Sequence, residues 1–189
     1  MSVDQETGIW NLGTAKKRHR FDAPLAAKIA ELFSPVLAAD LGCGIGEYCK
    51  AFKEHGWPAV HGYEGTPEIA EIAVYDNIQV LDLTKRRWVG INYDMVVCLE
   101  VGEHIPPKHE QTFIENVLEF THKDLVLSWA IPGQGGAGHF NERSNEYVIG
   151  KFTKNGLIYE DLLSQGLRNS ATLSWFKNTI LVFRKKTSN

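Results

Sequence analysis

A glycine-rich turn near residue 40 constrains the fold of this chain more than any other feature. An apolar run ends in Asp40, and glycines follow at every second position, Gly42, Gly44 and Gly46. Glycine has no Cβ atom, so the backbone can turn tightly and come within contact distance of a ligand. The helix expected after the turn offers unpaired N–H groups to the same ligand. The pattern therefore predicts a first strand, a nucleotide-cradling turn and a helix.

The spacing of the glycines distinguishes two classes of nucleotide-binding turn. Dinucleotide-binding folds use G-x-G-x-x-G, with no acid directly before the motif. This chain reads D-x-G-x-G-x-G, and Glu47 stands where the third dinucleotide glycine would fall. The turn resembles motif I of the class I S-adenosylmethionine (SAM)-dependent methyltransferases, which implies that Asp40 faces the amino group of the methionyl part of SAM. A tight strand-to-helix connection without a ligand is the alternative for the motif taken alone.

The second and third predicted strands also end in acids. Glu64-Gly65 follows the second strand and Asp82-Leu83 follows the third. Right-handed crossovers place the carboxyl ends of parallel strands at one edge of a sheet, so we expect these residues beside the glycine turn, at the cofactor. A carboxylate at Glu64 can accept hydrogen bonds from both ribose hydroxyls. By the resemblance, Asp82 accepts a hydrogen bond from the adenine amino group, and Leu83 packs near the ring.

The segment after the fourth predicted strand is rich in groups that can do chemistry. It reads Glu100-Val101-Gly102-Glu103-His104-Ile105-Pro106-Pro107. This run resembles the LEV-x-EH-IP signature after strand four in many small-molecule methyltransferases. We expect Glu100 to face the cofactor or polar groups of the substrate. Glu103 is expected to contact the substrate or to orient His104.

The loop at 131–147, after a fifth predicted strand at 125–130, is expected to hold the methyl acceptor together with the N-terminal segment. Four glycines and a proline make it a mobile loop, which suits a lid or a substrate clamp. Its many hydrogen-bonding side chains favour a polar acceptor rich in hydroxyls. Glu142 and Arg143 are interpreted as solvent-facing residues before a helix that Asn141 or Ser144 caps. The residues assigned to the substrate here are Trp129, Asn141, Asn145 and Tyr147.

Two histidines are candidates for a catalytic base. Methyl transfer from a sulfonium needs an aligned acceptor and, for a hydroxyl, removal of its proton, and histidine is suited to that task near neutral pH. His139 is the first candidate because it lies on the glycine-flexed loop, and His104 is the second. The other histidines are interpreted as structural residues away from the functional edge; they are His19, His55, His61, His109 and His122.

The remaining patterns complete an α/β fold. Two β runs at 172–176 and 179–183 flank Lys177-Asn178, which favours a terminal hairpin, and a helix is expected over 157–163, ending at Gly166. The family resemblance implies a Rossmann-like, doubly wound sheet of seven strands. This sheet is expected to be mostly parallel, with one reversed strand in a C-terminal antiparallel hairpin.

Length and composition limit the domain organisation. A chain of 189 residues with 43% apolar content can bury one good core but hardly two, so we expect a single domain over 1–189. A helix is expected to open at Asp22-Ala23-Pro24, an N-cap followed by a first-turn proline. Residues 1–21 are expected to fold over the cofactor pocket as an N-terminal cap segment; disorder of the first residues is the alternative.

Several classes of function and location are disfavoured. The net charge of −3 is small, and the basic run at 16–20 is interpreted as solvated rather than as nucleic-acid binding. The NPPY-type tetrapeptide of amino-methylating nucleic-acid enzymes is replaced by Cys98-Leu99-Glu100-Val101. No apolar stretch approaches the roughly 20 residues of a membrane span, and the N-terminus lacks a signal-peptide core, so a cytoplasmic protein is expected. Cys43, Cys49 and Cys98 lack paired metal spacing, which predicts free thiols and no metal.

These observations predict a SAM-dependent methyltransferase, most simply an O-methyltransferase, that acts on a small polar acceptor. The loop after strand five is also similar to loops of small methyltransferase modules that accompany glycosyltransferases, which favours a hydroxyl of a sugar or glycan end. Two alternatives stay open. One is methylation of another small molecule through an amine, phenol or carboxylate, and the other is a module that binds SAM without catalysis.

Overall fold

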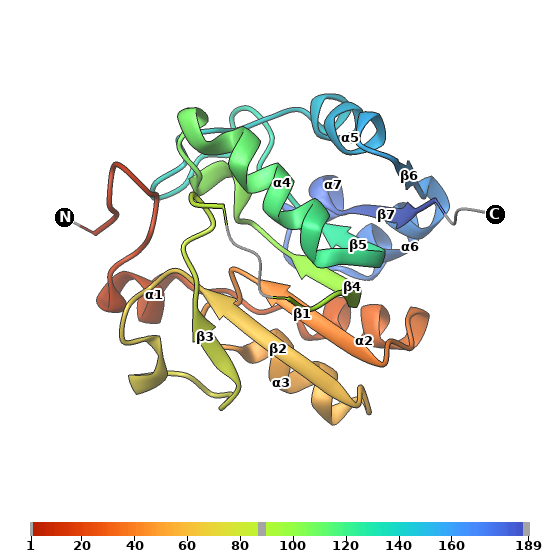
Figure 1. Cartoon of the computed structure of the whole chain (residues 1–189), viewed down its shortest axis with the longest axis horizontal. Coiled ribbons are helices and arrows are strands. Elements are labelled where there is room, and N and C mark those ends of the chain that lie inside the picture. Colours follow the sequence, from red (N-terminus) through yellow and green to blue (C-terminus); the bar gives the residue numbers. More distant parts are fainter. Residues whose placement is uncertain (1, 87–89, 187–189) are drawn as a thin grey trace.

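The computed structural model describes residues 2–86 and 90–186, and within them the chain folds into an α/β structure around one twisted sheet (Figure 1). The strand order is β3-β2-β1-β4-β5-β7-β6. β7 runs antiparallel to both neighbours, and the other pairs are parallel. The strands are β1 (Leu37–Leu41), β2 (Ala59–Glu64), β3 (Ile78–Val80), β4 (Tyr93–Cys98), β5 (Thr121–Leu127), β6 (Leu157–Tyr159) and β7 (Leu181–Lys185). The predicted seven-stranded, mostly parallel fold is confirmed.

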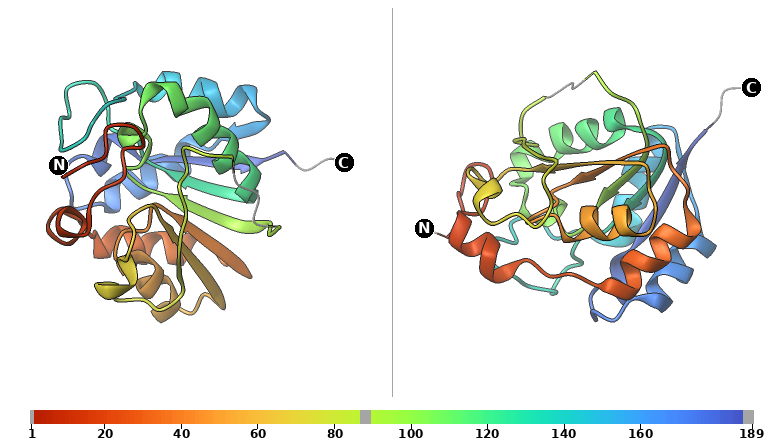
Figure 2. Two further views of the ribbon diagram at one scale, coloured as in Figure 1. Left: turned by 60° about the vertical axis from the view of Figure 1, so that its left-hand side comes forward. Right: turned by 90° about the horizontal axis from the view of Figure 1, so that it is seen from below.

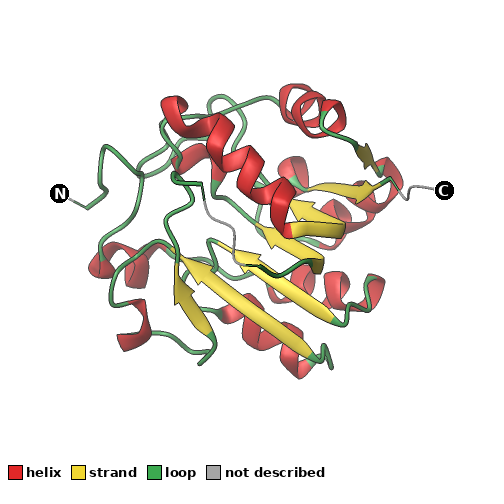
Figure 3. Ribbon diagram, viewed as in Figure 1, coloured by secondary structure: helices red, strands yellow, loops and turns green. Residues whose placement is uncertain are grey.

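Helices cover both faces of the sheet (Figures 2 and 3). Successive residues of a strand point to opposite faces, so Ala38 and Val97 pack in one core layer while Ala39 and Val96 pack in the other. The first layer is shared with α2 (Ala23–Leu32), α3 (Glu47–Glu54), α6 (Asp161–Ser170) and α7 (Phe176–Thr179), and the second with α4 (Glu110–Phe120) and α5 (Asn145–Lys154). Burial on both faces explains why the central strands read as nearly continuous apolar runs.

The topology places a crevice at the carboxyl ends of β1 and β4. β1 pairs with β2 on one side and β4 on the other, so the chain leaves β1 in one direction and later returns to its opposite edge. Ligands of open α/β sheets bind at such a switch point, because the loops after the two strands diverge there. The N-terminal segment crosses this edge: it forms an antiparallel bridge between Val3 and Trp10 and continues into α1 (Leu12–Arg18). α1 was not expected from the sequence.

The C-terminal part differs from the predicted hairpin. The segment at 172–175 is not a strand, and residues 176–179 form α7 instead of a turn and a strand start. The partner of β7 at the sheet edge is β6, in a segment predicted to be helical, and α6 runs through Gly166. A three-residue strand carries too little periodicity to be told from a helical turn, and its pairing with β7 is decided by tertiary contact.

Two other local predictions, the cap at Asp22 and the free thiols, are confirmed. The side chain of Asp22 caps α2 by accepting a hydrogen bond from the Leu25 N–H (3.1 Å). Cys43, Cys49 and Cys98 are buried free thiols. Among the helices of the described ranges, none combines the length and apolarity that a membrane crossing needs.

Candidate active site

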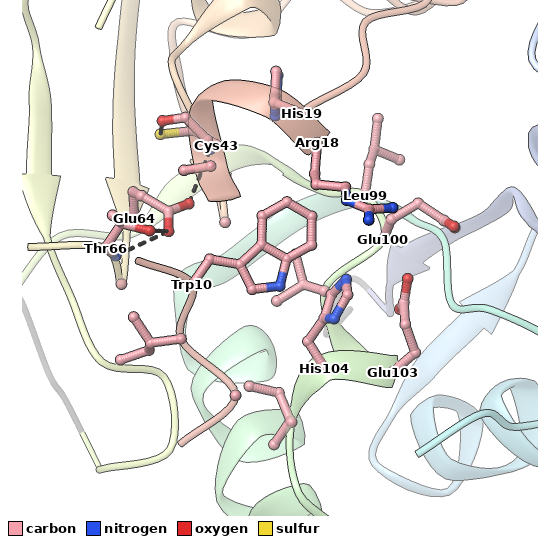
Figure 4. A pocket seen from close by; sticks show the side chains of 18 of the residues that line it. Trp10, Arg18, His19, Cys43, Glu64, Thr66, Leu99, Glu100, Glu103 and His104 are labelled. Atoms are coloured by element: carbon pink, nitrogen blue, oxygen red, sulfur yellow. Dashed lines mark hydrogen bonds between the residues drawn. The ribbon is translucent and has the colours of Figure 1, made fainter. Parts of the chain in front are cut away.

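A cavity of about 460 Å³ opens at the switch point, beneath the N-terminal segment. Its volume lies within the range of about 300–1,000 Å³ usual for small-molecule sites. Figure 4 shows Trp10 between two groups of side chains, with Cys43 and Glu64 on one side and Glu100 and His104 on the other. Eleven of the residues assigned from the sequence line this cavity: Asp40, Gly42, Gly44, Glu64, Gly65, Asp82, Leu83, Glu100, Glu103, His104 and His139.

The glycine turn after β1 is one wall of the cavity. Gly44 has a φ of 55°, and a Cβ atom there would lie 2.2 Å from Nδ1 of His19. Both the left-handed backbone and the close ring require glycine at this position. Gly46 has another function: it precedes α3 with a φ of 88° and does not line the cavity. A Cβ on Gly46 would meet the side chains of Tyr75 and Ile78.

Asp40 lies at the end of β1, and its carboxyl group is buried. Its side chain is 3% exposed, and Oδ2 accepts a hydrogen bond from the Cys49 thiol at 3.5 Å. Burial raises the pKa of Asp40 to about 7, with the charge of Glu64 adding to the effect. A cationic ligand group beside this carboxyl would restore its charged form.

Glu64 joins the end of β2 to the glycine turn. Its Oε2 accepts a hydrogen bond from the Gly44 N–H at 2.9 Å, and its Oε1 accepts from the N–H and the hydroxyl of Thr66 at 2.9 and 2.8 Å. A carboxylate has about four acceptor sites, so Glu64 can take further donors from the cavity. Thr66 was missed from the sequence, although a hydroxyl two residues after a strand-end acid is a recognisable local turn.

Asp82 follows β3 and is held in its charged form. Burial alone would raise its pKa, but hydrogen bonds from Thr84 (2.9 Å from N–H, 2.5 Å from the hydroxyl) and the Lys85 ammonium at 2.9 Å hold the pKa below its usual value. Leu83, beside it, is 7% exposed and lines the cavity. The segment after β3 therefore provides the cavity with one carboxylate and one apolar surface.

Glu100 begins the opposite wall with a strained backbone. Its φ of 54° is left-handed, a conformation that costs a non-glycine residue about 1–3 kcal/mol. The Glu100 N–H donates to the Ser128 hydroxyl, which donates to Oε1 of the same glutamate (both 2.8 Å). Oε2 accepts from the Gln134 side chain at 2.6 Å. These bonds aim the carboxylate at the cavity, and burial raises its pKa.

Glu103 is a completely buried carboxyl beside Glu100. Its exposure is 0%, and among the described residues neither carboxyl oxygen has a partner in hydrogen-bond geometry. Burial raises the pKa of Glu103 well above its usual value, and the nearby charge of Glu100 raises it further. An unpaired carboxyl in a dry site costs stability unless another group compensates it.

Two imidazoles complete this wall. Nδ1 of His104 lies 3.0 Å from the carbonyl oxygen of Gly138, and Nδ1 of His139 lies 3.0 Å from Oε1 of Glu142. Carbonyl and carboxylate oxygens only accept, so in each neutral ring Nδ1 carries the proton and Nε2 keeps its electron pair. The two ring centres are 5.0 Å apart, edge to face. Burial lowers the pKa of His104 to about 4.

The loop after β5 is tied down rather than free. Glu142 accepts hydrogen bonds from the Gly133 N–H (2.7 Å) and the Gly135 N–H (2.6 Å) as well as from His139. The Phe140 N–H also donates to the Glu103 carbonyl at 2.8 Å. The expectations of a mobile loop and of a solvent-facing Glu142 therefore differ from the structure. Glu142 holds the loop closed and orients a ring at the cavity.

Four residues assigned to the substrate lie outside the cavity. Glu110 binds two of them: it accepts hydrogen bonds from the Asn141 amide (3.0 Å) and the Tyr147 hydroxyl, and also from the Arg143 guanidinium (2.8 Å). The other partners are backbone carbonyls. The indole of Trp129, 1% exposed, donates to Asn141 at 2.6 Å, and the Asn145 amide donates to Asn178 at 2.7 Å. The structure thus gives Trp129, Asn141, Asn145 and Tyr147 roles in holding the loop and α5.

The N-terminal segment contributes residues that sequence reasoning did not assign. His19 was interpreted as lying away from the site, but it lines the cavity, and burial lowers its pKa to about 4. Arg18 and Arg20 are exposed, as the interpretation of the basic run as solvated requires, and they also line the cavity. Trp10 packs edge-on against His104 with ring centres 5.0 Å apart. The sequence feature that could have indicated these cavity residues is an aromatic residue followed by a basic run in a short segment before the first predicted helix.

Known proteins share the sequence pattern of this chain. Residues 17–122 match the family model described as a methyltransferase domain. Magnesium-protoporphyrin O-methyltransferase from Synechocystis is 26% identical over 103 residues, which are 50% of this chain and 44% of that protein. The chain thus matches less than half the length of this curated relative.

Solved structures share the fold. Magnesium protoporphyrin IX methyltransferase from Synechocystis with bound SAH superposes with a TM-score of 0.60 and 20% identity, over 86% of this chain and 80% of that one. An amino pentose methyltransferase from Micromonospora echinaspora with bound SAM gives a TM-score of 0.64 and 16% identity, over 85% and 90% of the two chains.

Proposed function

The chain belongs to the methyltransferase domain family and uses SAM, and from that premise we propose that it methylates a hydroxyl group of a small polar acceptor, a sugar or glycan end. The observation that carries the proposal is the His139–Glu142 pair in the wall that faces the glycine turn across the cavity. It supplies a proton acceptor on the side of the cavity opposite the glycine turn.

The residues at the glycine turn fit SAM. Gly44 lets the turn backbone approach its neighbours closely, because a Cβ atom there would collide with the His19 ring. Among the described residues no cationic side chain pairs with the buried Asp40, and the methionyl ammonium would supply that charge. We assign the methionyl part to Asp40, Gly42 and Gly44, with Gly46 shaping the turn. Arg18 and Arg20 line the cavity, and we assign them as candidates to pair with the methionyl carboxylate. When bound, SAM supplies an electrophilic methyl group on a sulfonium.

The ribose and adenine are assigned to the ends of β2 and β3. Glu64 and Gly65 face the ribose, where the carboxylate has acceptor capacity left. Asp82 accepts from the adenine amino group, and Leu83 provides the apolar surface for the ring. Glu100 faces the sulfonium end from the opposite wall, where its carboxylate is held by Ser128 and Gln134.

His139 is the first candidate to assist loss of the acceptor proton. Glu142 accepts the Nδ1 proton, which leaves Nε2 free to accept another, and a carboxylate partner stabilises the imidazolium that results. His104 has a carbonyl partner, and burial lowers its pKa to about 4, so it suits a positioning role better than that of a base near neutral pH. We assign Glu103 to the acceptor side of the cavity.

Two similarities support the choice of acceptor. The curated relative is an O-methyltransferase, and a structural neighbour is an amino pentose methyltransferase. Glu100, Glu103, His104 and His139 on the histidine side carry groups that can hydrogen-bond to the hydroxyls of an acceptor. An amine, phenol or carboxylate acceptor, and SAM binding without transfer, are the alternatives that the experiment separates.

The test is a reaction of the purified chain with SAM and a panel of sugars, catechols and small amines. We expect SAH release that depends on a sugar, and mass spectrometry should find a sugar heavier by one methylene group. A methylated catechol or amine without a methylated sugar would reject the sugar acceptor. SAM binding without product from any acceptor class would favour the non-catalytic alternative.

A further inference from the structure

Glu103, His104 and His139 form a cluster that the proposed base does not fully explain; we call it the two-histidine cluster. One ligating atom of each residue lies within 4.8 Å of those of the others. The cluster lines the cavity, and Figure 4 shows Glu103 and His104 on the side of Trp10 opposite the glycine turn. We propose that these three residues bind one divalent transition-metal cation, with open coordination positions toward the cavity.

The hydrogen bonds of the two rings are those of metal-ligating histidines. In metal sites the imidazole usually donates its second N–H to a carbonyl or carboxylate, which fixes the tautomer and the ring orientation. His104 makes this bond to Gly138 and His139 makes it to Glu142, both at 3.0 Å. Both rings therefore present Nε2 with its electron pair, the form in which histidine binds a metal.

Glu103 gives a second reason to expect a cation, which does not depend on the two imidazole rings. It is fully buried, both oxygens lack hydrogen-bond partners, and no ion pair with Lys or Arg reaches it or Glu100 among the described residues. A buried carboxylate is normally paired or bound to a metal. With Glu100 and Glu142 close by, the wall carries acidic groups that a divalent cation would neutralise.

The backbone already holds the ligands together. Glu103 and His104 lie on the short helix η2 (Gly102–His104), and the Glu103 carbonyl accepts hydrogen bonds from the N–H groups of Phe140 and Asn141 at 2.8 and 3.0 Å. These bonds join the two chain segments that carry the ligands. A tetrahedral site with ligand bonds near 2.0–2.1 Å needs ligand atoms about 3.3 Å apart, so the side chains must close slightly around the cation.

The donor set selects the class of metal. Two imidazole nitrogens and one carboxylate suit Zn²⁺, Co²⁺ or Fe²⁺, whereas Mg²⁺ and Ca²⁺ prefer oxygen ligands throughout. Three protein ligands leave at least one position for water or for an acceptor oxygen, as in catalytic rather than structural zinc sites. The role of the cation rests on the proposed function: bound to the acceptor oxygen, it would lower the pKa of the hydroxyl, whose proton would pass to water, and His139 would then serve as a ligand instead of a base.

The test measures metal binding without SAM or acceptor. The untagged full chain, stripped with a chelator, is titrated with Co²⁺ by visible absorption, and Zn²⁺ is then added as a competitor. We expect one cation per chain and at least tenfold weaker binding in Glu103→Gln, His104→Ala and His139→Ala. Matched changes at exposed residues, His122→Ala and Glu31→Gln, should leave binding unchanged.

Glu103→Gln keeps the shape of the side chain, so it remains informative if an alanine variant fails to fold by circular dichroism. Absence of binding in the wild-type chain would overturn the proposal, as would equal binding by the wild type and Glu103→Gln. Methyl transfer is measured separately in the stripped and loaded chain. Transfer without metal binding would reject this inference alone, and metal binding without transfer to any acceptor would reject the proposed function alone.

Discussion

The two walls of the cavity are built in different ways. On the turn side, Asp40, Glu64 and Asp82 each lie at or just beyond the carboxyl end of a strand, and most of their partners come from neighbouring turns. On the histidine side, the Glu100–His104 segment depends on the loop after β5, through bonds to Ser128, Gln134 and Gly138.

This difference separates binding from chemistry. The turn side offers three acids and a glycine cradle at fixed strand ends, which suits recognition of one cofactor. The histidine side holds a strained residue, two oriented rings and a carboxyl that has no hydrogen-bond partner within the described part of the chain. Strain and perturbed pKa values of this kind gather at functional sites. We therefore expect changes on the turn side to alter SAM affinity and changes on the histidine side to alter turnover.

The largest effect is expected from His139→Ala. Whether the ring accepts a proton or binds a cation, its loss should lower kcat by roughly a hundred- to ten-thousandfold. SAM affinity, measured by calorimetry, should stay within about twofold, because the turn side is untouched. His122→Ala, on an exposed part of β5, is the control. Full turnover of the His139 variant on the true acceptor would remove the distinction between the walls.

On the turn side, Glu64→Ala should weaken SAM binding by roughly ten- to a hundredfold. The substitution removes an acceptor for the ribose and the tether to Gly44 and Thr66, and a charge-assisted hydrogen-bond pair contributes about 1.5–3 kcal/mol. Calorimetry gives the affinity, and Glu71→Ala, an exposed acid outside the cavity, is the matched control. Unchanged affinity would show that the ribose lies elsewhere.

A smaller effect, a change of about tenfold in SAM affinity, is expected from a change of pH. Asp40 has a pKa of about 7 in the free chain, and it must be ionised to pair with the methionyl ammonium, so SAM binding should weaken about tenfold from pH 8 to pH 6. Asp40→Asn should bind SAM more weakly and with little pH dependence. Parallel pH profiles of the two proteins would place the ammonium away from Asp40.

The same carboxyl has a stability consequence of opposite sign. Folding favours its neutral form, so its contribution to stability is complete below the ordinary Asp pKa of about 3.9 and is lost as the pH rises to about 7. The Tm of Asp40→Asn should therefore rise relative to that of the free wild type between pH 5 and pH 8. A constant difference across this range would contradict the raised pKa.

The smallest effect on function is expected from Tyr147→Phe. The hydroxyl donates to Glu110 outside the cavity, so its loss should lower the free energy of unfolding by about 1.5 kcal/mol and leave kcat and SAM affinity within about twofold. Denaturant unfolding and steady-state kinetics give the two values. A large loss of turnover with unchanged stability would indicate that Tyr147 contacts the acceptor after all.

Much of the turn side could be predicted from the sequence alone. The glycine spacing, the acid at each strand end and the N-cap at Asp22 are local patterns, because the backbone conformations that they require are set within a few residues. The nearly continuous apolar strands likewise determined the fold class, since only a sheet covered on both faces buries them.

Tertiary structure decided the rest. Residues 157–159 form β6 because they pair with β7. Asn141 and Tyr147 lie outside the cavity because their side chains donate hydrogen bonds to the buried Glu110. His139 lies beside Glu103 and His104 because the loop after β5 donates hydrogen bonds to the Glu103 carbonyl, and because Glu142 holds the loop through hydrogen bonds from Gly133 and Gly135. These are contacts between distant segments, and their energies depend on burial and partner geometry that no local sequence pattern contains.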